Sequence, residues 1–131
     1  MYYAINKGAI YEVKIEDSIL NSIKKFLGIG VDYDAFDMDI MIHINSVFSI
    51  LTQLGVGPSD GFMICDSTSQ WSDFIEDEKL FNIIKSYIYL KVRLLFDPPI
   101  NSSVLDAMKK QIEEFEWRIN IYAEGGKNQN G

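Results

Sequence analysis

The chain is poor in the residues on which most protein chemistry depends. Its 131 residues include one cysteine, one histidine and three prolines. A single cysteine excludes a disulfide within the chain, which suits a reducing compartment. Positive charge is also scarce, because 12 Lys and Arg face 19 Asp and Glu for a formal net charge of −7. Nucleic-acid binding depends on clustered Lys and Arg, so this composition argues against a protein that grips DNA or RNA.

Long apolar runs are missing as well. No stretch approaches the roughly 18 consecutive apolar residues of a membrane span. The first residues, MYYAINKGAIYEVK, lack a basic region followed by an apolar run, so we expect no secretory signal. Hydrophobic residues nevertheless make up 47% of the chain, which is enough to bury a core. The length fits one domain.

The first fourteen residues differ from the rest. Residues 2–13 are rich in Tyr, Ile and Val, and Asn6, Lys7 and Gly8 form a candidate turn between two short runs. We expect an extended arm or a weak hairpin here. A two-stranded hairpin is marginal in water by itself, so the arm should rest on another part of the protein.

Hydrophobic periodicity predicts four or five helices after this arm. The predicted spans are 18–27, 38–54, a short one at 70–76, 79–96, and a last helix that starts after residues 101–103. The predicted fold class is therefore all-α, a bundle of four to five helices with an N-terminal extended arm or weak hairpin. We divide the chain into an arm (1–14), a helical domain (15–123) and a flexible C-terminal tail (124–131).

The helix predicted at 79–96 is apolar over most of its circumference, which is typical of a central helix with neighbours on several sides. A narrow polar stripe interrupts it, formed by Asn82, Lys85, Ser86, Tyr89 and Arg93. Two prolines follow. Pro98 disfavours a helical conformation at Asp97, so the helix should end near Phe96.

The last helix has a continuous apolar seam on one side. Its members step by three and four residues: Leu105, Met108, Ile112, Phe115, Ile119 and Tyr122. Ser103 and Asp106 have capping-box spacing at its start. At about 100° per residue, Trp117 and Ile121 fall opposite the seam. Either another helix or another subunit must cover this tryptophan.

Four aspartates fall in the segment VDYDAFDMDI: Asp32, Asp34, Asp37 and Asp39. An EF-hand calcium loop begun at the first of them fails, because Asp37 stands where the loop needs Gly and His43 where it needs Glu. The cluster is instead typical of an acidic helix start, with Asp37 as the cap. Magnesium bound here is the one route to an enzyme that the sequence leaves open.

No other catalytic arrangement is visible. His43 has no partner at a useful spacing and is expected at a helix surface or boundary. Cys65 has no base near it in a recognisable signature and is expected to be a small buried thiol. We therefore predict no catalytic residues, no cofactor and no metal site.

Three stretches resemble a known family when taken together. They are MIHINSVFSILTQLGVGP (41–58), YIYLKVRLLFDPP (87–99) and SSVLDAMKKQIEEFEWRINIYAEGG (102–126). They are similar to the head–tail connector (adaptor) proteins of tailed bacteriophages, and the likeness leaves the first fourteen residues outside it. The resemblance implies a structural subunit, not an enzyme, that forms a ring of usually twelve copies beneath the portal.

The same resemblance implies partners and a location. The ring would join the portal protein to a stopper or head-completion protein, and DNA would pass through its centre without specific binding. The location implied is the neck of the virion, after assembly in the bacterial host cytoplasm, with no membrane involved. Candidate interface residues are Trp117, Arg118 and Ile121 on the last helix, with Tyr89 and Arg93 from the polar stripe.

A different interpretation remains open. The chain could be a small helical interaction protein, such as a host-directed inhibitor or regulator. It would then act as a monomer or dimer and bind one partner through the face that carries Trp117.

Overall fold

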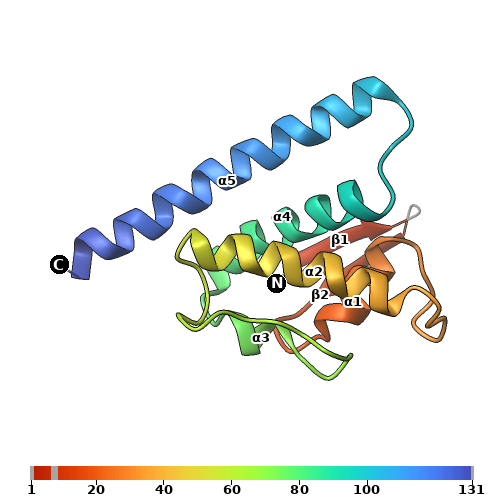
Figure 1. The fold of residues 1–131 in the computed structure, drawn as a ribbon, viewed down its shortest axis with the longest axis horizontal. Helices are drawn as coiled ribbons and strands as arrows, with labels where there is room; N and C mark the ends of the chain where they lie inside the picture. The colour runs from red at the N-terminus through yellow and green to blue at the C-terminus, as the bar shows by residue number, and fades with distance from the viewer. Residues whose placement is uncertain (1, 7–8, 131) are drawn as a thin grey trace.

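The computed structural model describes residues 2–6 and 9–130, and helices dominate it (Figure 1). A two-stranded antiparallel hairpin, β1 (Tyr2–Asn6) and β2 (Ala9–Val13), comes first. The helices in the described residues are α1 (Ile19–Phe26), α2 (Asp37–Gln53), α3 (Trp71–Phe74), α4 (Glu78–Phe96) and α5 (Ser102–Asn130). The predicted all-α fold with a weak N-terminal hairpin is therefore confirmed.

The hairpin rests on α1, as its marginal stability requires. The Tyr11 hydroxyl donates a hydrogen bond of 3.2 Å to the carbonyl oxygen of Ser22. The Lys25 ammonium lies 4.4 Å from the centre of the Tyr11 ring, and Val13 is buried in the core. These contacts attach the hairpin to the helical body.

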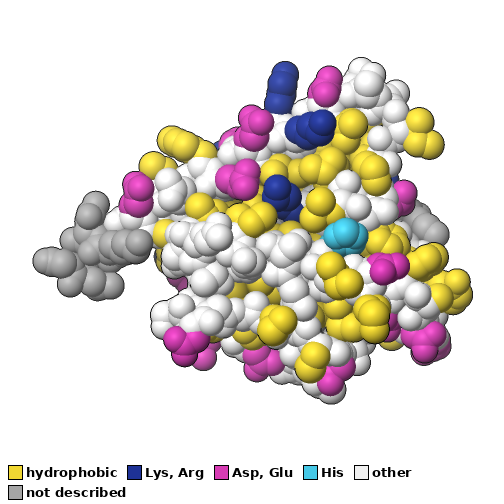
Figure 2. All heavy atoms as spheres, in the orientation of Figure 1, with side chains coloured by type: hydrophobic (Ala, Val, Ile, Leu, Met, Phe, Trp, Pro, Cys, Tyr) yellow, Lys and Arg dark blue, Asp and Glu magenta, His cyan; other side chains and the backbone are white. Residues whose placement is uncertain are grey.

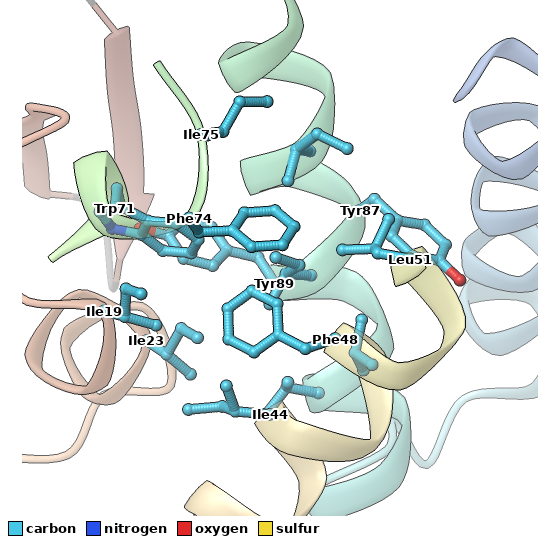
Figure 3. Packing of buried hydrophobic residues seen from close by; sticks show 14 of the residues in the cluster. Ile19, Ile23, Ile44, Phe48, Leu51, Trp71, Phe74, Ile75, Tyr87 and Tyr89 are labelled. Atoms are coloured by element: carbon cyan, nitrogen blue, oxygen red, sulfur yellow. The ribbon is translucent and has the colours of Figure 1, made fainter. Parts of the chain in front are cut away.

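Helix α4 is central, as the sequence predicted. It packs against α2 on one side and against α5 on another (Figure 1). Figure 3 shows large side chains meeting around it: Trp71 and Phe74 come from α3, and Phe48 from α2. The rings of Phe48 and Phe74 are 4.6 Å apart between centroids. Burial on this scale supplies most of the stability of a domain of this size.

Part of the polar stripe on α4 is buried inside the protein. Lys85 and Tyr89 are both buried, because α1 and α3 cover that side of the helix as well. The Tyr89 ring stacks on Phe26 at 4.5 Å, and Trp71 lies edge-on to it at 6.3 Å. Burial lowers the pKa of the Lys85 ammonium and raises that of the Tyr89 hydroxyl well above its ordinary value.

The corner between α4 and α5 lies where the prolines predicted it. Helix α4 ends at Phe96, and Asp97 leaves the helical region with φ −148° and ψ 71°. The cap of α5 differs from the prediction. The Asn101 side-chain oxygen accepts hydrogen bonds from the backbone N–H groups of Ser103 (2.9 Å) and Val104 (3.1 Å), so Asn101 replaces Ser103 as the cap.

Asp37 also has a different role from the one expected. It is the first residue of α2 instead of its cap, and its carboxylate lies 2.8 Å from the ammonium of Lys24. That ammonium also donates to the carbonyl oxygen of Val31 at 3.0 Å. A buried lysine needs a counter-charge and acceptors, and this aspartate supplies the charge. The pair fixes the connection between α1 and α2 on the body.

Two further expectations are corrected in the segment before α4. The helix predicted at 70–76 is a single turn, α3, with the Asp73 carboxylate accepting from the backbone N–H of Gln70 at 2.8 Å. Cys65 is exposed and not buried. The buried position belongs to its neighbour Ile64, whose backbone N–H and carbonyl both hydrogen-bond to the side chain of Asn45.

Helix α5 is the longest helix in the described residues. Its 29 residues span about 43 Å at 1.5 Å per residue, against about 28 Å for the 19 residues of α4. The helix continues past Tyr122, the last residue of the predicted seam, through Gly125 to Asn130. The division into arm, helical domain and flexible tail remains a prediction. Across residues 2–6 and 9–130, no helix has both the length and the hydropathy needed to span a membrane.

Candidate interaction surface

The inner face of α5 is the seam that the sequence predicted. Ile112 and Ile119 are buried, while Met108 and Phe115 are half-buried against the same core. In the described residues, α4 is the only element with which α5 makes an extensive contact. Figure 1 shows the two helices running side by side after the corner. The seam therefore attaches α5 to the body along one side only.

Two hydrogen bonds between side chains add to this seam. The Tyr87 hydroxyl, which points from α4 toward α5 in Figure 3, donates to the Glu116 carboxylate at 2.8 Å. The Tyr122 hydroxyl donates to the carboxylate of Asp77, the N-cap of α4. This hydrogen bond is the main reason that the pKa of Asp77 lies below its usual range. The bond to Glu116 joins the middles of the two helices, and the bond to Tyr122 joins the start of α4 to the second half of α5, so the helices are antiparallel.

The outer face of α5 is apolar at its centre and open to solvent. Trp117 is 64% exposed and Ile121 is 50% exposed. The Arg118 guanidinium forms an exposed ion pair of 2.6 Å with Glu114, four residues earlier. We call this surface the α5 outer face and define it by these four residues and the exposed Lys110. No helix of the described chain covers Trp117, which closes one of the two alternatives that the sequence left open.

The five candidate interface residues thus lie in three environments. Trp117, Arg118 and Ile121 lie together on the α5 outer face. Tyr89 is only 3% exposed and lies inside the subunit, where it stabilises the fold and offers no surface for a partner. Arg93 is half-buried near the end of α4, and its carbonyl oxygen accepts the backbone N–H of Asp97 at 2.8 Å.

A second surface was not singled out from the sequence. A groove of about 590 Å³ lies where the ends of α1, α2 and α4 meet. Its lining residues are Leu27, Ile29, Phe36, Asp39, Ile42, His43, Phe96 and Asp97. We call it the acidic groove. Figure 2 shows hydrophobic and acidic side chains next to one another on the face that carries the histidine.

Aromatic rings organise the acidic groove and its rim. The centroid of Phe36 lies 5.6 Å from that of Phe96 and 5.7 Å from that of Tyr33, which is exposed. The His43 ring lies 6.4 Å from Phe96. The sequence signal for an exposed apolar and acidic surface beside the groove is the alternation of apolar and acidic residues in VDYDAF, residues 31–36, of which Phe36 lines the groove. Such a pattern places apolar side chains at the surface beside carboxylates.

The aspartate cluster does not converge on a common point suited to a cation. Asp37 is committed to Lys24, and Asp39 lines the acidic groove. Over the part of the chain that the structure describes, no group of three or more His, Cys, Asp or Glu side chains is arranged to hold a metal ion. His43 lies within α2 and is half-buried in the groove wall.

Comparison with known proteins adds one finding. A family model described as "Phage connector protein" matches residues 19–126, which is 108 of the 131 residues. No curated protein and no solved structure shows significant similarity to the chain. The matched span begins with α1 and includes the corner between α4 and α5, together with Trp117. The chain therefore belongs to the phage connector protein family.

Proposed function

We propose that this chain is an adaptor subunit that forms a ring beneath the portal of a tailed bacteriophage. The ring, of about twelve copies as the family resemblance implies, would link the portal to a stopper or head-completion protein. The role is structural, with no catalytic step and no cofactor. The subunit would assemble in the host cytoplasm and reside in the neck of the virion. The observation that carries the proposal is the exposed Trp117 on a helix that packs on one side only.

An exposed tryptophan at the centre of a helix favours a protein interface. Tryptophan and arginine are enriched among the residues that dominate binding energy, and Trp117 has Arg118 beside it. Ile121 continues the apolar surface one turn later. Leaving such a surface in water forgoes about 25 cal/mol for each Å² of apolar area that a partner would cover. A neighbouring subunit is the partner that a ring supplies.

Net charge supports the passage of DNA through the ring. The chain carries seven more acidic than basic residues. A channel lined by acidic subunits repels phosphates and offers few of the Lys and Arg contacts that would hold DNA in place. DNA would therefore slide through the ring without specific binding.

The proposal also gives roles to the candidate residues on α4 and to the last part of α5. Arg93 would lie at the edge of a subunit contact, while Tyr89 serves the fold from inside the subunit. Tyr122 bonds to the N-cap of α4, so the part of α5 beyond it projects past the N-terminal end of α4. This projecting segment is available to the portal or the stopper.

Imaging the purified chain with the portal protein of the same phage tests the proposal. We expect electron microscopy to show a ring seated on the portal, and sedimentation to show both proteins in one complex. A chain that remains a monomer or dimer and does not bind the portal protein at high concentration would contradict the proposal. That result would favour the alternative of a small helical interaction protein.

A further inference from the structure

The chain has two exposed apolar surfaces that differ in charge. The α5 outer face combines Trp117 and Ile121 with the cations Lys110 and Arg118, and one of these cations is paired with Glu114. The acidic groove combines apolar walls with Asp39 and Asp97, and no Lys or Arg lines it. The residues that line the groove lie just after α1, at the start of α2 and at the end of α4, and none of them belongs to α5. One molecule therefore presents both surfaces at the same time.

We propose that the α5 outer face of one copy docks into the acidic groove of the next copy. This inference rests on the proposed function, because it assigns the contact from which the ring is built. Apolar side chains would bury against apolar walls: Trp117 and Ile121 on one copy, and Phe36, Ile42 and Phe96 on the other. Lys110 and Arg118 would face Asp39 and Asp97 across the rim.

Charge complementarity favours this occupant of the groove. Two more exposed carboxylates, Asp32 and Asp34, lie on the loop just before α2. The nearest buried cation, Lys24, is already paired with Asp37. The groove therefore combines exposed carboxylates and apolar walls, which cations and apolar side chains of a partner would complement. The α5 outer face is an exposed surface of this chain that provides both, and opposite charges at a rim raise the association rate and fix the orientation.

The contact is of the kind that builds rings. Two different surfaces meet, so each added copy leaves one free groove and one free α5 outer face at the ends of the growing assembly. Assembly continues until the last copy closes on the first. A contact between two identical surfaces would stop at a dimer.

Cysteine crosslinking tests the contact directly. In a Cys65→Ser background, one preparation carries Ile42→Cys in the groove and a second carries Ile121→Cys on the α5 outer face. The two are mixed with the portal protein of the same phage and oxidised. We expect a disulfide-linked dimer of the two variants, with less than a tenth of that yield from either variant alone. The double variant should give a ladder of dimers, trimers and longer chains.

Two controls sharpen the reading. Met63→Cys is an exposed site on the loop between α2 and α3, outside the acidic groove, and it should not crosslink to the Ile121→Cys chain. Lys110→Glu combined with Arg118→Glu in the Ile121→Cys chain should lower the mixed yield about tenfold at low salt, since like charges would then face Asp39 and Asp97. The inference would be overturned if disulfide-linked dimers formed only between copies of the same variant. It would also be overturned if Ile121→Cys crosslinked to Ile42→Cys no more than to Met63→Cys.

Crosslinking and portal binding test this inference and the proposed function separately. A ring seen on the portal without the mixed crosslink would leave the adaptor role intact and overturn the contact. A mixed crosslink and a ladder formed without any association with the portal would support the contact and contradict the adaptor role. Failure of both would overturn both.

Discussion

The two tryptophans of the chain lie in opposite surroundings. Trp71 is fully buried in the body, its ring lies 5.7 Å from that of Phe81, and its indole N–H donates to the Ser22 hydroxyl at 3.2 Å. Trp117 lies on α5 and is 64% exposed. Both are large apolar side chains in helices, yet only the first is used by the fold. The difference shows that the body and α5 are built for different purposes.

The same contrast holds for the two regions as wholes. In the body, α4 is enclosed by α1, α2 and α3, so that even Lys85 on its polar stripe is buried. Helix α5 is attached along one seam, and its other side faces solvent with apolar residues. A region enclosed on all sides serves stability. A region attached on one side, with an apolar outer face, is suited to a partner.

Replacing each tryptophan by alanine gives the largest contrast. Trp71→Ala should lower the free energy of unfolding by about 3–5 kcal/mol, because it empties a packed site and leaves the Ser22 hydroxyl without its donor. Trp117→Ala should change the stability of the monomer by less than about 0.5 kcal/mol. Urea denaturation of both variants measures this. Comparable losses would show that Trp117 is part of the core.

Breaking one ion pair in each region gives a smaller contrast. Lys24→Met leaves the Asp37 carboxylate without its buried partner and should cost about 3 kcal/mol, near the low end for buried pairs because Asp37 is partly exposed. The double variant Lys24→Met/Asp37→Leu should recover part of that loss. Arg118→Met breaks the exposed pair with Glu114 and should cost less than about 0.5 kcal/mol. Equal costs, again from denaturation, would contradict the assignment of a buried pair.

Glycine to alanine substitutions should have opposite signs in the two regions. Gly57 has φ +85°, and a Cβ there would collide with the Phe74 ring, so Gly57→Ala should destabilise the body by about 1–3 kcal/mol. Gly125 lies in α5 with open space around its Cα, so Gly125→Ala should raise helicity and add up to about 1 kcal/mol to local helix stability. Thermal melts and circular dichroism check both. A stabilised Gly57→Ala would show that Phe74 can move away.

The smallest effect concerns the hydrogen bond that ties α5 to the start of α4. Tyr122→Phe removes the donor that lowers the pKa of Asp77, so this pKa should rise toward the ordinary value of about 3.9. A carboxyl whose folded pKa is depressed adds stability above its unfolded pKa and loses it as the pH falls through the folded pKa. The stability gap between wild type and variant should therefore close below about pH 4. An NMR titration of Asp77 checks the shift, and an unchanged pKa would contradict it.

Sequence patterns predicted the helices well, because long apolar periodicities specify one buried face. They gave the α5 seam, the stop at Phe96 and the position of Trp117 opposite the core. They failed where the environment of a residue depends on distant segments. Tyr89 looked like part of a polar surface, but α1 and α3, which come earlier in the chain, cover it.

The same reason explains the missed groove and the misassigned caps. The acidic groove joins residues near 27, 39 and 97, and no local pattern links these positions. Asp37 was assigned as a cap because no local pattern predicts its ion pair with a buried lysine 13 positions earlier. Asn101 lies one residue before the first helical residue of α5, and only its geometry shows that it accepts from two backbone N–H groups there.

Sedimentation of wild type and Trp117→Ala with the portal protein tests the central claim most directly. The account predicts that wild type forms a ring on the portal. The variant, with an unchanged melting temperature, should bind at each contact about 2 kcal/mol more weakly, or roughly thirtyfold, and fail to assemble at the same concentration. Met63→Ala, at a similarly exposed site elsewhere, should assemble like wild type. Rings of normal yield with Trp117→Ala would contradict the claim that the α5 outer face joins the subunits.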